Sequence, residues 1–168
     1  MASQATVVRP TSVSLSVASL VPLAVCVGVT SILHPGMDGV VWGCIVFLSY
    51  RILVVRLLLL RHHRRGITLT RAGDFVRAIA AFEQSEAFFA AHPTIDRLRA
   101  PLLGSAVRHS FSALAIYNQA YCYARVGDGA RARRLLDKAL TLDPQMVIAR
   151  ELRDVLEAGA LSAREVRA

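Results

Sequence analysis

The side chains best suited to chemistry in this chain, its cysteines and histidines, are too scattered to form a catalytic or metal site. The three cysteines are Cys26, Cys44 and Cys122, and no pair has the Cys-x-x-Cys spacing of a metal or redox motif. His62 and His63 are adjacent, so in a helix they point to different faces, and the other histidines are isolated. Phosphate-binding loops, nucleophile elbows and metalloprotease signatures do not occur. We therefore predict a protein that is not an enzyme and has no catalytic residue, metal or cofactor.

The arginines are the next side chains that could bind a ligand or a surface, and the net charge of the chain is +8. Several arginines gather in one region, namely Arg51, Arg56, Arg61, Arg64 and Arg65. Nucleic-acid binding is not expected, because no aromatic side chains are threaded among the arginines and acidic residues are interspersed through the following domain. We predict that this region contacts anionic membrane lipids, since each basic residue near such a surface contributes about 1 kcal/mol to binding.

Two apolar stretches would position these arginines at a membrane. Residues 13–33 and 40–60 are each about 20 residues long, which is the length that an α-helix needs to cross roughly 30 Å of hydrocarbon. Residues 35–39 join them through a Pro/Gly-rich turn that reverses the chain. Basic residues are sparse before the first stretch and crowd the end of the second, as cytoplasmic flanks do. The prediction is a multi-pass inner-membrane protein with a transmembrane hairpin over 13–60, a tail over 1–12 and both termini in the cytoplasm.

Two features of the apolar stretches have alternative interpretations. A cleaved secretory signal does not fit the first stretch, because its start is barely charged and its apolar run is too long. Attachment of a lipid at Cys26 remains an alternative for that stretch. Arg51 and Arg56 lie within the second stretch, where we expect their side chains to extend to the headgroups. The alternative is that Arg51 pairs with an acidic group of another membrane protein.

Beyond residue 65 the sequence repeats a glycine–aspartate turn that opens a helix. Gly73-Asp74 and Gly127-Asp128 are each followed by an Ala four residues after the Asp and by a large apolar residue four further on. The Gly ends the preceding helix, where a left-handed conformation costs little without a Cβ. The Asp then caps the next helix. This pattern predicts two helix–turn–helix units.

The second of these units resembles a tetratricopeptide repeat, a 34-residue helix–turn–helix. The residues that carry the resemblance are Ile116, Gln119, Ala120, Tyr123, Gly127, Asp128, Ala132, Leu136, Ala139 and the closing Leu142-Asp143-Pro144. Ile116 and Gln119 replace the Trp and Leu of the family pattern, and Gly129 replaces its Tyr after the turn. The resemblance implies an all-α repeat domain over 66–157.

Within that domain we expect repeats at about 62–93 and 113–146. An inserted amphipathic helix at about 94–112, broken near Pro101, separates them. A cap helix at about 145–157 closes the array, and the basic cluster at 61–65 and a tail at 158–168 lie outside it. The complete prediction is an all-α chain in which a transmembrane hairpin precedes a short tetratricopeptide-like domain.

The resemblance also implies a binding surface, because the first helices of such repeats line a concave groove that takes peptides. Carried over to the second unit, the groove positions are Leu114, Tyr117, Asn118, Tyr121, Ala124 and Arg125. Tyrosines give large contact areas with a polar tip, and the arginine is suited to a carboxylate. The alternative is that the tyrosines pack on the inserted helix and that no groove is open.

The function that these expectations favour is a membrane-anchored adaptor or scaffold that holds an unidentified protein or peptide partner at the cytoplasmic face of the membrane. Lys138 is the single lysine, which suggests a GC-rich bacterial genome. One alternative is a structural membrane component that forms homo-oligomers through an open end of the array. Another is a regulatory subunit of a membrane enzyme or transporter that docks through Arg51.

Overall fold

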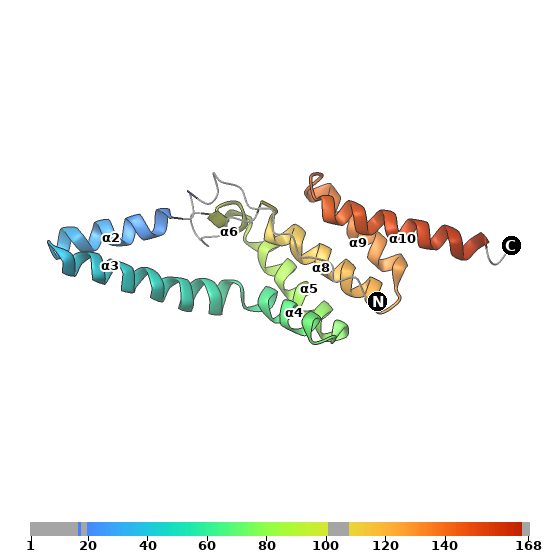
Figure 1. Ribbon diagram of the computed structural model, residues 1–168, viewed down its shortest axis with the longest axis horizontal. Helices are drawn as coiled ribbons and strands as arrows, with labels where there is room; N and C mark the ends of the chain where they lie inside the picture. Colours follow the sequence, from blue (N-terminus) through green and yellow to red (C-terminus); the bar gives the residue numbers. More distant parts are fainter. Residues whose placement is uncertain (1–16, 18–19, 101–107, 166–168) are drawn as a thin grey trace. The chain divides into compact units, whose positions relative to one another are not determined.

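The computed structural model describes residues 17, 20–100 and 108–165, apart from the side chains of residues 54, 56–59 and 161–165. These residues form helices and no strand (Figure 1), which confirms the all-α prediction. The chain divides into two compact units whose first boundary falls between Val55 and Arg56.

The first unit is built on two apolar helices, α2 (Val21–Leu33) and α3 (Met37–Ser49), which pack against each other. Pro22 lies in the first turn of α2, where its missing N–H would have no helical partner. The chain reverses at Gly36, whose φ of 101° favours glycine. The predicted antiparallel pair of apolar helices is therefore present, but its helices are short.

Small residues bring α2 and α3 into backbone contact. A Cβ atom at Gly39 would lie 2.2 Å from the carbonyl oxygen of His34, and one at Gly43 would lie 2.5 Å from the Cα atom of Val27. Thr30 Oγ1 donates a hydrogen bond of 2.6 Å to the carbonyl oxygen of Gly39 across the same contact. The spacing of the two glycines, one helical turn apart, therefore decides where the helices touch.

The membrane prediction is wrong. In the part of the chain that the structure describes, no helix is both long enough and apolar enough to cross a membrane. α2 and α3 have 13 residues each, and a helix of that length measures about 20 Å against roughly 30 Å of hydrocarbon. The second predicted span is divided, because α3 ends at Ser49 and a π-helix, η1 (Tyr50–Leu59), follows it. Residues 13–16 and 18–19 of the first span lie outside the described residues. The multi-pass inner-membrane location, with both termini in the cytoplasm, is therefore corrected.

The second unit contains five long helices and one short one. The long helices are α4 (Arg61–Arg71), α5 (Phe75–Ala91), α8 (Phe111–Arg125), α9 (Gly129–Leu142) and α10 (Val147–Glu165), and the short one is α6 (Pro93–Arg97). Each long helix packs against the next one along the chain. Residues 101–107 of the predicted inserted helix lie outside the described residues. α10 continues to Glu165, past the expected end of the cap helix near residue 157.

The two glycine–aspartate turns have the conformations that the sequence predicts. Gly73 has φ of 80° and Gly127 has φ of 87°, in the left-handed region that ends a helix. The carboxylate of Asp74 accepts a 3.0 Å hydrogen bond from the backbone N–H of Arg77. Asp128 caps α9 in the same way. These two turns fold α4 back on α5 and α8 back on α9.

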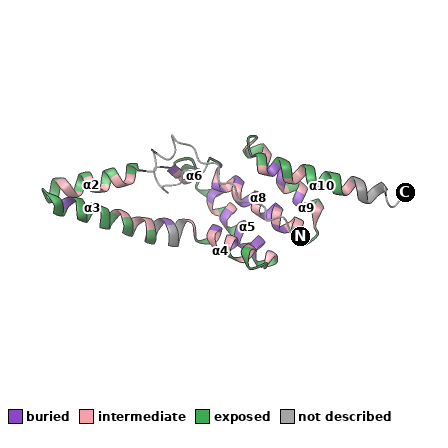
Figure 2. Ribbon diagram, viewed as in Figure 1, coloured by how far each residue is buried: buried purple, intermediate pink, exposed green. Residues whose placement is uncertain are grey.

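Buried residues of the second unit gather on α5, α8 and α9 (Figure 2). One cluster joins α5 to α8 through Ala78, Ile79, Phe82 and Cys122. A second cluster joins α8, α9 and α10 through Ala113, Ala120, Leu136, Met146 and Ala149. Because α8 contributes to both clusters, it lies at the centre of the unit.

Polar side chains also connect α5, α8 and α9 to one another. Gln119 on α8 is buried, and its Nε2 donates a 2.6 Å hydrogen bond to Oε2 of Glu86 on α5. Lys138 Nζ on α9 lies 2.5 Å from the other carboxylate oxygen of Glu86. Near the start of α8, Nδ1 of the buried His109 lies 2.6 Å from Oδ2 of Asp143. A carboxylate only accepts, so this ring nitrogen carries the proton.

Candidate partner-binding surface

The first turn of α8 is held by two side chains that satisfy its backbone N–H groups. Ser110 Oγ accepts a 3.1 Å hydrogen bond from the N–H of Ala113. The buried carboxylate of Asp96 accepts from the N–H groups of Phe111 and Ser112, at 2.7 and 3.0 Å. Free N–H groups at a helix start attract such acceptors. These contacts fix the position at which α8 begins.

α8 has one buried face and one face that is partly open to solvent. The buried face carries Phe111, Ala113, Ala115, Ile116, Gln119, Ala120 and Cys122. All six positions that the repeat pattern predicts as groove residues share the opposite face. Leu114, Tyr117, Asn118, Tyr121 and Ala124 are half-buried there, and Arg125 is exposed. We call these six residues the α8 face.

At one end of the α8 face, Tyr121 and Arg125 form a cluster with Phe75 of α5. The Arg125 guanidinium lies 5.0 Å from the centre of the Phe75 ring and 6.0 Å from that of Tyr121. Arg125 Nη1 also donates a 3.3 Å hydrogen bond to the Tyr121 hydroxyl. No carboxylate among the described residues forms an ion pair with Arg125. Its charge is thus held in place by aromatic rings and remains available to an acidic group.

Elsewhere on the α8 face, Leu114 and Tyr117 pack on the cluster shared with α9 and α10. Burial raises the pKa of the Tyr117 hydroxyl, and the charges of Tyr121 and Glu151 raise it further. The cluster on which Tyr117 packs includes Ala149 of α10, so the last helix contributes to the burial of Tyr117. Residues 101–107, which would test packing on the inserted helix, are outside the described residues.

The predicted membrane-interface arginines lie on η1 and α4. The Arg51 guanidinium lies 5.8 Å from the centre of the Phe47 ring. Arg61 Nε donates a 2.9 Å hydrogen bond to Nε2 of His62. On α4, Arg64 is half-buried and Arg65 is exposed. The side chain of Arg56 lies outside the described residues.

None of the six residues of the α8 face is a cysteine or a histidine. In the ranges that the structure covers, no group of three or more His, Cys, Asp or Glu side chains is arranged to hold a metal ion. Cys44 is exposed and Cys26 half-buried, and both are free thiols. Burial raises the pKa of the Cys122 thiol, which lies 3.5 Å from Thr70 Oγ1. A thiol with a raised pKa is a weak nucleophile at neutral pH.

Two residues near the α8 face, Phe75 and Glu151, were not predicted from the sequence. Phe75 directly follows the capping residue Asp74. An aromatic residue in the first turn of a helix, next to a predicted repeat turn, is a sequence feature that could have indicated this contact. Glu151 is one of several charged residues on α10, and nothing in its spacing separates it from the others. Both contacts depend on how helices that are distant in the sequence pack together. The repeat pattern alone carries no information on that packing.

Comparison of the chain with models of protein families, with curated proteins and with solved structures gave no match. The class is therefore defined by the fold: an all-α protein whose second unit stacks successive helices around a central one. The six-residue α8 face is the candidate site of that unit.

Proposed function

We propose that the second unit is a small tetratricopeptide-like module that binds a partner protein or peptide on the α8 face. The pairs α4–α5 and α8–α9 share the same turn, with a left-handed Gly followed by a capping Asp. α10 packs on α9 as a closing helix would. These features support an array of two repeats and a final helix.

One observation carries the proposal. The groove positions implied by the repeat resemblance lie together on the partly open face of α8, while its other face forms the core. That face combines tyrosines, an amide and an arginine whose charge has no carboxylate partner among the described residues. Tyrosine and arginine are the side chains that most often dominate binding at protein interfaces. The module would act as an adaptor, through contacts and not through chemistry.

Site-specific photo-crosslinking tests the proposal. A photo-reactive amino acid replaces Asn118 in the full chain, and the same amino acid at the exposed Ala87 of α5 serves as the control position. After irradiation in native extract, position 118 should give one discrete protein adduct that position 87 does not give. Mass spectrometry of that adduct then identifies the partner.

Arginine variants show whether the adduct depends on the α8 face. Arg125→Ala should weaken binding of the identified partner by about tenfold or more, because a hydrogen bond to a charged group contributes roughly 1.5–3 kcal/mol. Arg134→Ala removes the same charge from an exposed position on α9 and should leave the affinity unchanged. Equal labelling at positions 118 and 87, or equal affinities of the two arginine variants, would contradict the proposal.

A further inference from the structure

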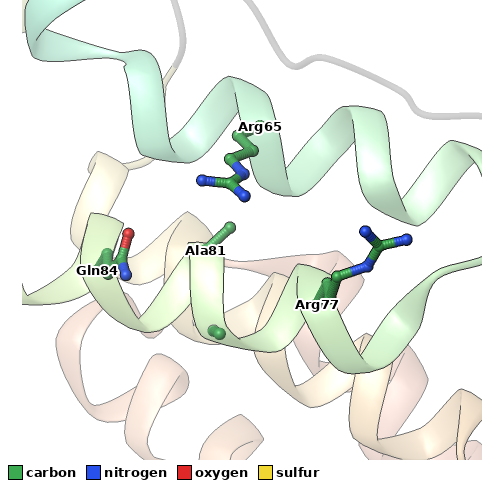
Figure 3. A pocket seen from close by; sticks show the side chains of 5 residues that line it. Arg65, Arg77, Ala81 and Gln84 are labelled. Atoms are coloured by element: carbon green, nitrogen blue, oxygen red, sulfur yellow. The ribbon is translucent and has the colours of Figure 1, made fainter.

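A small hollow lies between α4 and α5, lined by Arg65, Arg77, Ala80, Ala81 and Gln84. Arg65 extends from α4 toward Ala81, and Arg77 and Gln84 stand on either side of that alanine along α5 (Figure 3). Arg77, Ala81 and Gln84 are four and then three residues apart, so they share one face of the helix. We call these five residues the α4–α5 hollow.

The floor of the α4–α5 hollow is apolar, and most of the polar groups on its rim are hydrogen-bond donors. Ala81 is 5% exposed, and an alanine at this position leaves the space that a longer side chain would fill. The rim consists of two guanidinium groups and one amide, and no acidic residue belongs to the lining. Guanidinium groups present several N–H donors and no acceptor. The Gln84 amide adds N–H donors and one acceptor oxygen, so the lining offers more donors than acceptors and suits a group that accepts hydrogen bonds.

The two arginines of the rim differ in their partners. Arg77 forms an ion pair with Asp74, the residue that caps α5. Arg65 is exposed, and no carboxylate in the described ranges lies within ion-pair distance of it. One full positive charge of the α4–α5 hollow is therefore not neutralised, and Arg77 keeps donors that its pair with Asp74 does not use.

We propose that the α4–α5 hollow binds a phosphoryl group, either as free phosphate or as the monoester of a small molecule. The three polar side chains of the lining come from α4 and from two positions of α5. A phosphoryl group offers three terminal oxygens to such donors, whereas a carboxylate offers two oxygens in one plane. The site lies between α4 and α5, apart from the α8 face, and does not depend on the partner-binding proposal.

Calorimetric titration of the full chain tests the proposed phosphate site. Inorganic phosphate and methyl phosphate serve as the probes for the free and the esterified form, and acetate at the same ionic strength tests for carboxylate binding. We expect one binding event with a dissociation constant of about 1 mM or below for at least one of the phosphate probes. The tighter probe identifies the form that the hollow takes. Acetate should bind at least roughly tenfold more weakly.

Variants locate the binding event in the hollow. Arg65→Ala and Gln84→Leu should each weaken phosphate binding, the arginine variant by roughly tenfold or more. Arg134→Ala, which removes an equivalent exposed charge from α9, should bind phosphate as the unaltered chain does. Circular dichroism confirms that each variant is folded. Absence of phosphate binding, equal binding of acetate, or undiminished binding by Arg65→Ala would overturn the proposal.

Discussion

At the scale of single residues, Gly66 sets how closely α4 approaches α5. A Cβ atom there would lie 2.6 Å from Cε1 of Phe82, whose side chain is buried in the core. Gly66→Ala should therefore lower the free energy of unfolding by about 1–3 kcal/mol, the usual cost of overpacking. Urea unfolding followed by circular dichroism measures the change.

Gly159 provides the matched control for that substitution. It is exposed on α10, and a Cβ atom there would meet nothing within 4 Å. Gly159→Ala should therefore raise stability by about 0.5–1 kcal/mol, because alanine loses less backbone freedom in a helix than glycine does. If both variants shifted stability in the same direction, the close contact between Gly66 and Phe82 would not exist as described.

At the scale of helices, Glu86 ties α5 to α8 and α9 through one carboxylate. Removing it in Glu86→Ala leaves the amide of the buried Gln119 without its acceptor, which should cost about 1–3 kcal/mol. Lys138→Ala removes only a lysine whose side chain is 55% exposed, and should cost less than about 1 kcal/mol. Thermal unfolding of the two variants measures the difference, and a larger loss for Lys138→Ala would refute this ranking.

Helix pairs of the second unit could be predicted from the sequence because their signals are local. A glycine that ends one helix and an aspartate that caps the next lie side by side in the chain, so both turns are found without knowledge of distant contacts. The six positions of the α8 face were implied by the repeat resemblance, and their spacing within one helix places them on the same face. Phe75 and Glu151, which lie near that face, come from other helices and could not be found in this way.

The apolar segments show where such local reasoning fails. Hydropathy measures how apolar a segment is and contains no information on the hydrogen-bonding pattern of a helix. It therefore did not reveal the change from the α-helix α3 to the π-helix η1 after Ser49. Continuous apolar composition over 40–60 therefore predicted one long α-helix, whereas the chain is α-helical to Ser49 and forms a π-helix from Tyr50 to Leu59. The spacing of Gly39 and Gly43, which the prediction did not use, corresponds to the close helix–helix contact in this segment.

At the scale of the whole molecule, we assign two tasks to the central helix of the second unit. Its buried face joins the clusters on either side, and its other face remains for a partner. If this is correct, the α8 face is open in the purified chain and covered in the cell. A side chain at position 118 reports on both states, because Asn118 is half-exposed at the middle of that face.

The rate at which a cysteine at position 118 reacts with a maleimide measures this directly. Asn118→Cys is prepared with Cys44→Ser, which removes the exposed native thiol, and Ala120→Cys on the buried face is the slow reference. We predict that position 118 reacts much faster than position 120 in the purified chain, and that native extract slows its reaction by about tenfold or more. Equal rates at position 118 in purified chain and native extract would contradict the account.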